Sequence, residues 1–281
     1  MTSCSKSEIR RCRPLLGTFV EITAGGKGEA AMQDAINAAF ATIERIQNRF
    51  SVHDSASELS LLNREAGERV VIVSAEMFKI LRRAQRIAKE SNGAFDCAIA
   101  PTLANWGLRP ACLKRKRAGT WRDVQLLRGR KVKFRRSLAL DLGGIAKGYA
   151  VDQAIEVLRK CGVTSAVVNA GGDLRAFGLQ ASTIHLRHPA RPQTFARTIE
   201  LKQSALATSS PCFTLKKSGR GTVSHLVDTR RGDAITSTVS VTVRARECWL
   251  ADALTKVVLN APRRAETLLA KYRAEAFMLT A

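Results

Sequence analysis

The chain has 281 residues, of which 45% are hydrophobic and 25% are charged, an ordinary composition for a globular protein. It is long enough to bury a sizeable core, in one large domain or in two smaller ones. Its net charge of +22 is unusual, and the absence of any run of about 18 apolar residues excludes a transmembrane helix.

The N-terminal segment Met1–Arg13 is polar and basic and lacks the apolar core of a secretory signal. The seven cysteines are scattered, with no C-x-x-C pair and no Cys/His spacing typical of zinc sites. An odd, scattered set of this kind is typical of reduced thiols in a reducing compartment. The sequence therefore predicts a cytoplasmic protein.

The first part of the chain alternates short strands with amphipathic helices. Apolar side chains alternate in the first strand, and Gly25–Gly28 would end it. Helical spacing and capping residues mark the helices that follow. In chain order, the predicted elements are a strand at Leu15–Thr23, a helix at Glu29–Phe50, a short helix beginning at Ser57–Ser60, a strand at Val70–Val73 and a helix at Ser74–Ser91.

An irregular segment, Phe95–Gly107, leads into the most basic part of the sequence. From Arg109 to Arg136 there are twelve Lys or Arg and one acid, Asp123. Such a segment would attract nucleic acid, a membrane surface or an acidic protein, or would form a solvated basic face. It contains no obvious helix for reading a nucleic-acid groove, so nucleic acid is the least favoured of these partners.

The remaining elements continue to the C-terminus without a linker or an internal repeat. We therefore predict one α+β unit over residues 1–281. The predicted strands are Val132–Phe134, Leu138–Leu142, Ser165–Asn169, Ile184–Arg187, Ala196–Leu201, Ala205–Thr208, Thr238–Arg244 and Ala276–Thr280, and the predicted helices are Ala150–Cys161, Leu250–Asn260 and Pro262–Tyr272.

The most informative stretch is Asp141–Asp152, in which a glycine turn follows an apolar run and opens a helix. Backbone N–H groups and the helix dipole at such a turn suit phosphate or pyrophosphate, and Lys147 adds a cation. The spacing matches neither standard nucleotide fingerprint. A tight turn with a solvated lysine is the alternative interpretation.

Two further groups of residues carry polar chemistry. Asp252, Thr255 and Lys256 stand at positions i, i+3 and i+4 of a predicted helix, so they share one face. Their oxygens could ligate Mg²⁺, or Asp252 and Lys256 could form a salt bridge on the helix surface. His225 and Asp228 could act as a base and the group that orients it, or could belong to a structural turn.

The order of these and other segments resembles that of one known family. The segments are Leu16–Ile22, Phe50-Ser51 with Ser57–Ser60, Phe95-Asp96 with Trp106-Gly107, Asp141–Gly148, Asn169–Asp173, Ala207–Ser209, His225–Gly232 and Ala251–Leu254. Across nearly the whole chain this order is similar to the ApbE family, the FAD:protein FMN transferases.

The resemblance implies a T-fold-like α+β domain of mixed sheets with packed helices. FAD would bind in a cleft with Mg²⁺ on its diphosphate, and FMN would pass to a Thr or Ser hydroxyl of an acceptor protein with release of AMP. Offsetting the charge of the diphosphate and deprotonating the hydroxyl are the tasks of such a site.

The resemblance also assigns roles to individual residues. His225 and Asp228 would be catalytic and would help to activate the hydroxyl. The metal would be held by Ala146 through its carbonyl, by Asp252 and by Thr255. The residues implied in binding FAD are Thr18, Ser57, Glu58, Leu59, Asp141, Gly143, Gly144, Lys147, Gly171, Gly172, Asp173 and Lys256.

One departure from the family pattern bears on the metal. The family usually has a metal-ligating Thr where this chain has Lys256, and Thr255 stands one residue earlier. Either Thr255 takes the ligand role, or the Lys256 ammonium occupies the place of the metal. The second case favours an alternative function, a FAD-binding protein with weak or no transferase activity, because a single positive charge is a poor Lewis acid.

Overall fold

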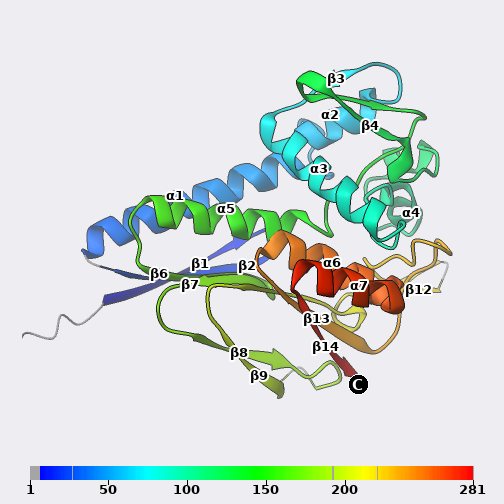
Figure 1. Ribbon diagram of the computed structural model, residues 1–281. Helices are drawn as coiled ribbons and strands as arrows, with labels where there is room; N and C mark the ends of the chain where they lie inside the picture. Colours follow the sequence, from blue (N-terminus) through cyan, green and yellow to red (C-terminus); the bar gives the residue numbers. More distant parts are fainter. Residues whose placement is uncertain (1–6, 27, 192, 220, 281) are drawn as a thin grey trace, which may run out of the picture.

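The computed structural model describes residues 7–26, 28–191, 193–219 and 221–280 (Figure 1). Cys4, the start of the segment Met1–Arg13 and Lys27 in the predicted glycine break lie outside the described residues. The described chain combines helices with antiparallel sheets, so the predicted α+β class is confirmed. None of its described helices has both the length and the apolar character needed to cross a bilayer.

A seven-stranded sheet forms the lower part of the molecule in Figure 1. Its strands follow the order β1-β2-β6-β7-β10-β13-β14, and every neighbouring pair is antiparallel. The strands are β1 (Ser7–Leu15), β2 (Thr18–Gly26), β6 (Ser165–Ala170), β7 (Asp173–Phe177), β10 (Ala205–Ser209), β13 (Val239–Ala245) and β14 (Glu275–Thr280).

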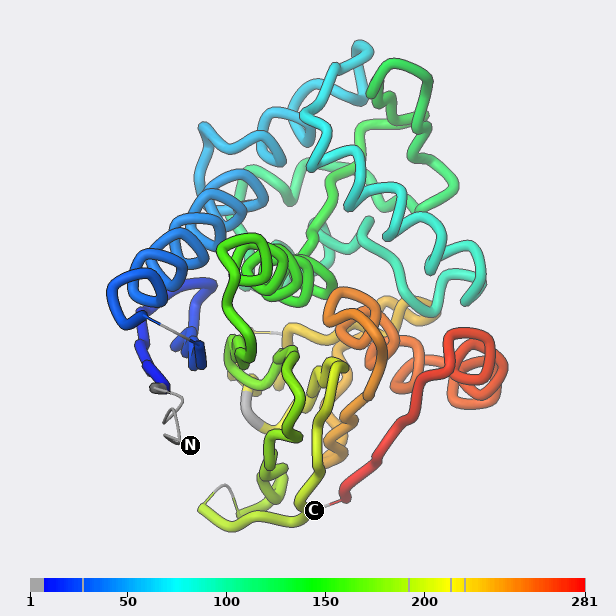
Figure 2. The backbone as a smooth tube through the Cα atoms, turned by 60° about the vertical axis from the view of Figure 1, so that its left-hand side comes forward, coloured from blue at the N-terminus to red at the C-terminus, as the bar shows by residue number. Residues whose placement is uncertain are grey.

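Helices cover one face of this sheet and a hairpin covers the other (Figure 1). Figure 2 shows α5 side by side with α1 and α6. A separate apolar cluster joins the sheet to the hairpin. The helices are α1 (Glu29–Phe50), α5 (Ala146–Lys160), α6 (Cys248–Asn260) and α7 (Pro262–Tyr272), and the hairpin strands are β8 (Ser182–Arg187) and β9 (Phe195–Leu201).

The chain between α1 and α5 forms the upper part of the molecule in Figure 1. A three-stranded sheet of order β3-β5-β4 lies there, and one continuous apolar core joins this part to the main sheet. Its elements are α2 (Glu58–Glu65), β3 (Val71–Ile72), α3 (Ala75–Glu90), α4 (Ala100–Asn105), η1 (Ala111–Arg115), η2 (Trp121–Asp123), β4 (Val124–Leu127), η3 (Arg128–Arg130) and β5 (Lys131–Phe134). After β10 come η4 (Pro211–Phe213) and the hairpin of β11 (Lys216–Ser218) and β12 (Gly221–Val223).

The structure differs from several of the predicted elements. The predicted strand Leu15–Thr23 spans a hairpin turn at Leu16-Gly17, where both φ angles are positive, and β2 begins only at Thr18. The edge strand β1 lacks an alternating apolar pattern because only Ile9 is buried among its described positions. The segment predicted as irregular, Phe95–Gly107, contains α4, whose six residues are too few to show helical spacing.

The predicted strand Leu138–Leu142 is buried but belongs to no strand of the described sheets. The side chain of Asn63 takes the place of a neighbouring strand, since it accepts from the Leu140 N–H at 2.8 Å and donates to the Leu140 carbonyl at 2.9 Å. The helix after this segment also begins earlier than predicted, at Ala146 instead of Ala150.

Candidate functional site

The glycine turn at the start of α5 opens toward solvent. Gly143 is exposed and Gly144 is half-buried, and the N-cap residue Ile145 contributes no side-chain hydrogen bond to the first turn of the helix. The partial positive charge of the helix N-terminus therefore points at an accessible site. Backbone N–H groups in this arrangement suit an anion such as a phosphate.

A close approach of two helices places α6 beside this turn. A Cβ atom on Gly148 would lie 2.6 Å from the backbone C of Cys248 and 2.7 Å from the backbone N of Trp249, so a larger residue does not fit without movement. The Gly148 N–H donates to Oδ2 of Asp252 at 3.3 Å. The contact between the helices thus fixes a buried carboxylate of α6 next to the first turn of α5.

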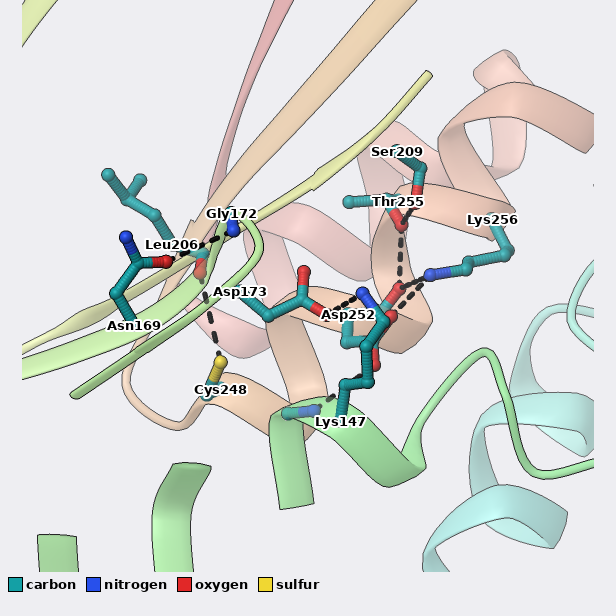
Figure 3. A network of polar contacts seen from close by, with 11 residues as sticks. Lys147, Asn169, Gly172, Asp173, Leu206, Ser209, Cys248, Asp252, Thr255 and Lys256 are labelled. Atoms are coloured by element: carbon teal, nitrogen blue, oxygen red, sulfur yellow. Dashed lines mark hydrogen bonds and ion pairs between the residues drawn. The ribbon is translucent and has the colours of Figure 1, made fainter. Parts of the chain in front are cut away.

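Two lysine–aspartate pairs form the polar centre of the site (Figure 3). Lys147 Nζ lies 2.6 Å from Oδ2 of Asp173, the first residue of β7. Lys256 donates to Oδ1 of Asp252 and, at 3.1 Å, to the Asp252 backbone carbonyl. The carboxylates are buried, and 33% of the Lys147 side chain and 17% of the Lys256 side chain are exposed. The four charges balance.

The electrostatics of this cluster keep Lys147 charged. Burial lowers the pKa of Lys147, but the carboxylates of Asp173 and Asp252 more than offset this effect, so its pKa lies above the ordinary value. Burial, together with the neighbouring Asp252, raises the pKa of Asp173, while Lys147 and Lys256 act in the opposite direction. The buried carboxylates of Asp173 and Asp252 can both stay ionised only because Lys147 and Lys256 pair with them.

The residues assigned to the metal do not form a set of free ligands. Oδ1 of Asp252 is bound by Lys256, and the Thr255 hydroxyl, fully buried, donates to the Asp252 carbonyl at 2.7 Å and lies 2.7 Å from Oγ of Ser209. Ala146 is the first residue of α5. Within the described part of the chain, no group of three or more His, Cys, Asp or Glu could hold a metal ion. The donor set does not fit Mg²⁺, which prefers several accessible oxygens.

Arg109 links the glycine turn to His225. Its guanidinium pairs with Oδ2 of Asp141, whose other oxygen accepts from the Gly143 N–H at 2.6 Å. The same guanidinium lies 3.2 Å from Nδ1 of His225. Because arginine only donates, Nδ1 must be the acceptor, and the ring proton is on Nε2. Burial and then the charge of Arg109 lower the pKa of His225, so the ring is neutral.

His225 and Asp228 do not form the predicted pair of a base and its orienting group. Among the described contacts of His225, the side-chain partner is Arg109 and not Asp228. Oδ1 of Asp228 accepts from the N–H groups of Arg230 and Arg231 at 2.9 and 3.1 Å, which closes its own loop. Both side chains are half-buried.

The β6–β7 turn brings Gly171 and Gly172 to the end of β2. Their φ angles of 62° and 100° suit glycine, and a Cβ atom on Gly171 would lie 2.5 Å from Oγ1 of Thr18. The Gly172 N–H donates to Oδ1 of Asn169 at 3.0 Å. Thr18 therefore lies beside the turn that precedes Asp173.

Ser57, Glu58 and Leu59 have structural partners and stand apart from the polar cluster. Ser57 caps α2 by accepting from the Ser60 N–H at 3.0 Å. Glu58 lies 3.2 Å from Nε of Arg49 and accepts from Oγ of Ser74 at 2.7 Å, and Leu59 is fully buried. Their implied role in binding FAD stays a prediction.

Sequence reasoning missed two residues that organise the site. Arg109 was read only as the start of a basic segment, although the buried Asp141 requires a cation. Asp152 on α5 caps the N-terminus of α6, since its carboxylate accepts from the N–H groups of Cys248 and Trp249 at 2.9 Å each. The same carboxylate lies 2.8 Å from Nη1 of Arg175. A polar residue in an apolar helical stretch was the signal for Asp152.

Comparisons with known proteins agree with this architecture. The chain is 28% identical over 229 residues to a FAD:protein FMN transferase of Vibrio cholerae, covering 75% of this chain and 69% of that protein. A FAD:protein FMN transferase of Chlamydia pneumoniae is 26% identical, with 88% and 81% covered. For a relative of that name from Treponema pallidum, 28% identical, the match covers 62% of this chain and 52% of that protein.

Solved structures share the fold. A Thermotoga maritima ApbE protein superposes with a TM-score of 0.87 at 24% identity, covering 98% of this chain and 94% of that one. The apo flavinyl transferase ApbE of Pseudomonas stutzeri gives 0.83 at 21% identity, with 100% and 93% covered. The model of the ApbE family matches residues 16–278. The chain therefore belongs to the ApbE family.

Proposed function

We propose that this chain is a FAD:protein FMN transferase. The hydroxyl oxygen of a Thr or Ser on an acceptor protein attacks the phosphorus on the FMN side of the diphosphate. A new P–O bond forms, the bond to the AMP phosphate breaks, and AMP leaves. The names of the relatives from Vibrio cholerae and Chlamydia pneumoniae support this assignment.

The observation that carries the proposal is the solvent-facing glycine turn at the start of α5 beside two lysines. The Gly143-Gly144 turn would cradle the diphosphate, and Lys147 and Lys256 would offset its negative charge. Positioned cations and backbone dipoles supply most of the catalysis in phosphoryl transfer. Thr18, Gly171 and Gly172 would shape the adjoining cleft, and Ser57–Leu59 would lie behind it.

His225 and Asp228 have different proposed roles. The neutral His225 ring would donate a hydrogen bond from Nε2, since Nδ1 is taken by Arg109. In the described structure, Oδ2 of Asp228 has no hydrogen-bond partner, so this oxygen is available as the proton acceptor for the incoming hydroxyl. No step of this scheme is assigned to Mg²⁺, because Asp252 and Thr255 are already committed to other partners.

The acceptor would meet a basic groove of about 1140 Å³ between α3 and the β4–η3 turn. Its exposed cations are Arg82, Arg86, Lys89 and Arg128, and Trp121 lies in its lining. These charges favour an acidic acceptor surface and would speed association. The free cysteines among the described residues fit a reducing compartment, which supports a cytoplasmic acceptor.

The test is covalent transfer. The purified chain is incubated with FAD and with cytoplasmic protein from its own organism, and the products are separated under denaturing conditions. We expect a fluorescent flavoprotein band, AMP in stoichiometric amount, and loss of both with the Lys147→Met variant. FAD binding without transfer or AMP release would instead favour the second candidate, a flavin-binding protein, which the occupation of Asp252 by Lys256 supports.

A further inference from the structure

We propose that the ammonium of Lys256 is a tethered cation for the FAD diphosphate, so that this chain binds FAD without a divalent metal. The inference rests on the proposed function, because it assumes that the α5 turn receives the diphosphate. It adds that the site contains its own cation, covalently attached to α6.

The carboxylate of Asp252 is fully used within the protein. Lys256 binds Oδ1, and the Gly148 N–H donates to Oδ2 at 3.3 Å. The Lys256 ammonium also donates to the Asp252 backbone carbonyl at 3.1 Å, so it is held by two oxygens of one residue. With Asp252 fully buried, a metal ion could reach this carboxylate only by displacing the ammonium.

Thr255 does not supply a substitute ligand. Its hydroxyl lies between the Asp252 carbonyl and Oγ of Ser209, at 2.7 Å from each, and the residue is fully buried. Figure 3 shows this hydroxyl on the Ser209 side of α6, with the Lys256 side chain extending separately to Asp252. These two partners hold the Thr255 hydroxyl on the β10 side of α6.

The Lys256 side chain runs along the glycine turn. A Cβ atom on Gly144 would lie 3.3 Å from Cε of Lys256, so the methylene next to the ammonium packs against the turn that would hold the diphosphate. Lys256 therefore lies between the glycine turn before α5 and the buried Asp252. Of its side chain, 17% is exposed.

Charge balance favours the same conclusion. Asp173 and Asp252 are matched by Lys147 and Lys256, which leaves the cluster neutral before any ligand binds. A divalent ion would add two positive charges to a cluster whose two carboxylates are already paired with ammonium groups. A diphosphate, by contrast, brings negative charge to two partly exposed lysine side chains.

The experiment is equilibrium titration of the flavin-free protein with FAD, in EDTA and in excess Mg²⁺ at matched ionic strength. For the wild-type chain we expect dissociation constants in the two buffers within a factor of about two. In EDTA, Lys256→Met should weaken FAD binding at least about tenfold, the effect of one lost charge-assisted contact. Lys256→Thr should lose a similar factor in EDTA and recover in Mg²⁺, because Asp252 is then free.

Lys271→Met is the matched control, since Lys271 also pairs with a carboxylate, Glu90, at 2.8 Å, but lies on α7. We expect it to bind FAD as the wild type does. If FAD binding by the wild type tightens tenfold or more when Mg²⁺ is added, the inference is overturned. This result does not depend on whether the variants fold. Unchanged affinity of folded Lys256→Met in EDTA would also overturn it. If the wild type binds no FAD in either buffer, the proposed function itself fails.

Discussion

Replacing Gly148 by alanine tests the contact between α5 and α6 on which the site depends. Helix propensity alone predicts that alanine inside α5 stabilises the protein by about 1 kcal/mol. The structure predicts the opposite, because the new methyl group would lie 2.6 Å from the backbone C of Cys248 and 2.7 Å from the backbone N of Trp249. These are main-chain atoms of α6, so a rotamer change cannot relieve the clash.

Overpacking of this kind costs about 3 kcal/mol at the upper end of its usual range. After subtraction of the propensity gain, we expect a net loss of about 2 kcal/mol, which corresponds to a fall in Tm of about 3–4 °C for a chain of 281 residues. The displaced α6 would also move Asp252 away from the Gly148 N–H, which now lies 3.3 Å from Oδ2. The Gly148→Ala variant should therefore have a lower affinity for FAD as well as a lower Tm.

The assay is thermal unfolding of both forms, followed by FAD titration at a temperature where both are folded. Gly219→Ala is the control, because a Cβ atom at Gly219 meets nothing within 4 Å, and it should leave Tm and FAD affinity unchanged. A Tm for Gly148→Ala equal to or above that of the wild type would refute the reasoning.

Three further predictions concern charged side chains. Burial raises the pKa of Asp96 from 3.8 to about 6, so the folded state holds this proton more tightly than the unfolded state; the stability of the wild type relative to Asp96→Asn should fall by about 3 kcal/mol as the pH rises from about 4 to about 7, and urea unfolding at both values checks this. Arg109→Met should raise the pKa of His225, and an unchanged histidine titration by NMR would contradict the proposed Arg109–His225 contact. Asp152→Asn leaves Arg175 without its buried partner and weakens the cap of α6. The free energy of unfolding should therefore fall by about 3–5 kcal/mol. Equal urea midpoints for the variant and the wild type would show that the cap is dispensable.

Sequence patterns were sufficient to predict a helix where that helix has many buried positions or a capping residue. Glu29–Phe50 matches α1 residue for residue, and the predicted cap Ser74 accepts from the Met77 N–H at 3.1 Å. The spacing of Asp252 and Lys256 also predicted that their side chains would meet on α6, as they do. Local periodicity and capping are properties of the chain itself, so they can be read without tertiary information.

Elements that depend on tertiary partners could not be predicted in this way. β7 begins with Asp173 and contains Arg175, and these charged residues are buried because Lys147 and Asp152 pair with them. The pairing of Arg109 with Asp141 crosses 32 positions of sequence, and no local pattern marks it. Buried charges of this kind are stable only with a partner, and the partner is visible only in the fold.

The most direct test of the account is a crystal structure of the FAD complex grown in MnCl₂, with anomalous data to locate manganese. We predict that the diphosphate lies against the Gly143-Gly144 turn, with the Lys256 ammonium between it and Asp252 and no manganese peak at that position. A diphosphate bound elsewhere, or a manganese ion bridging Asp252 to it, would contradict the account.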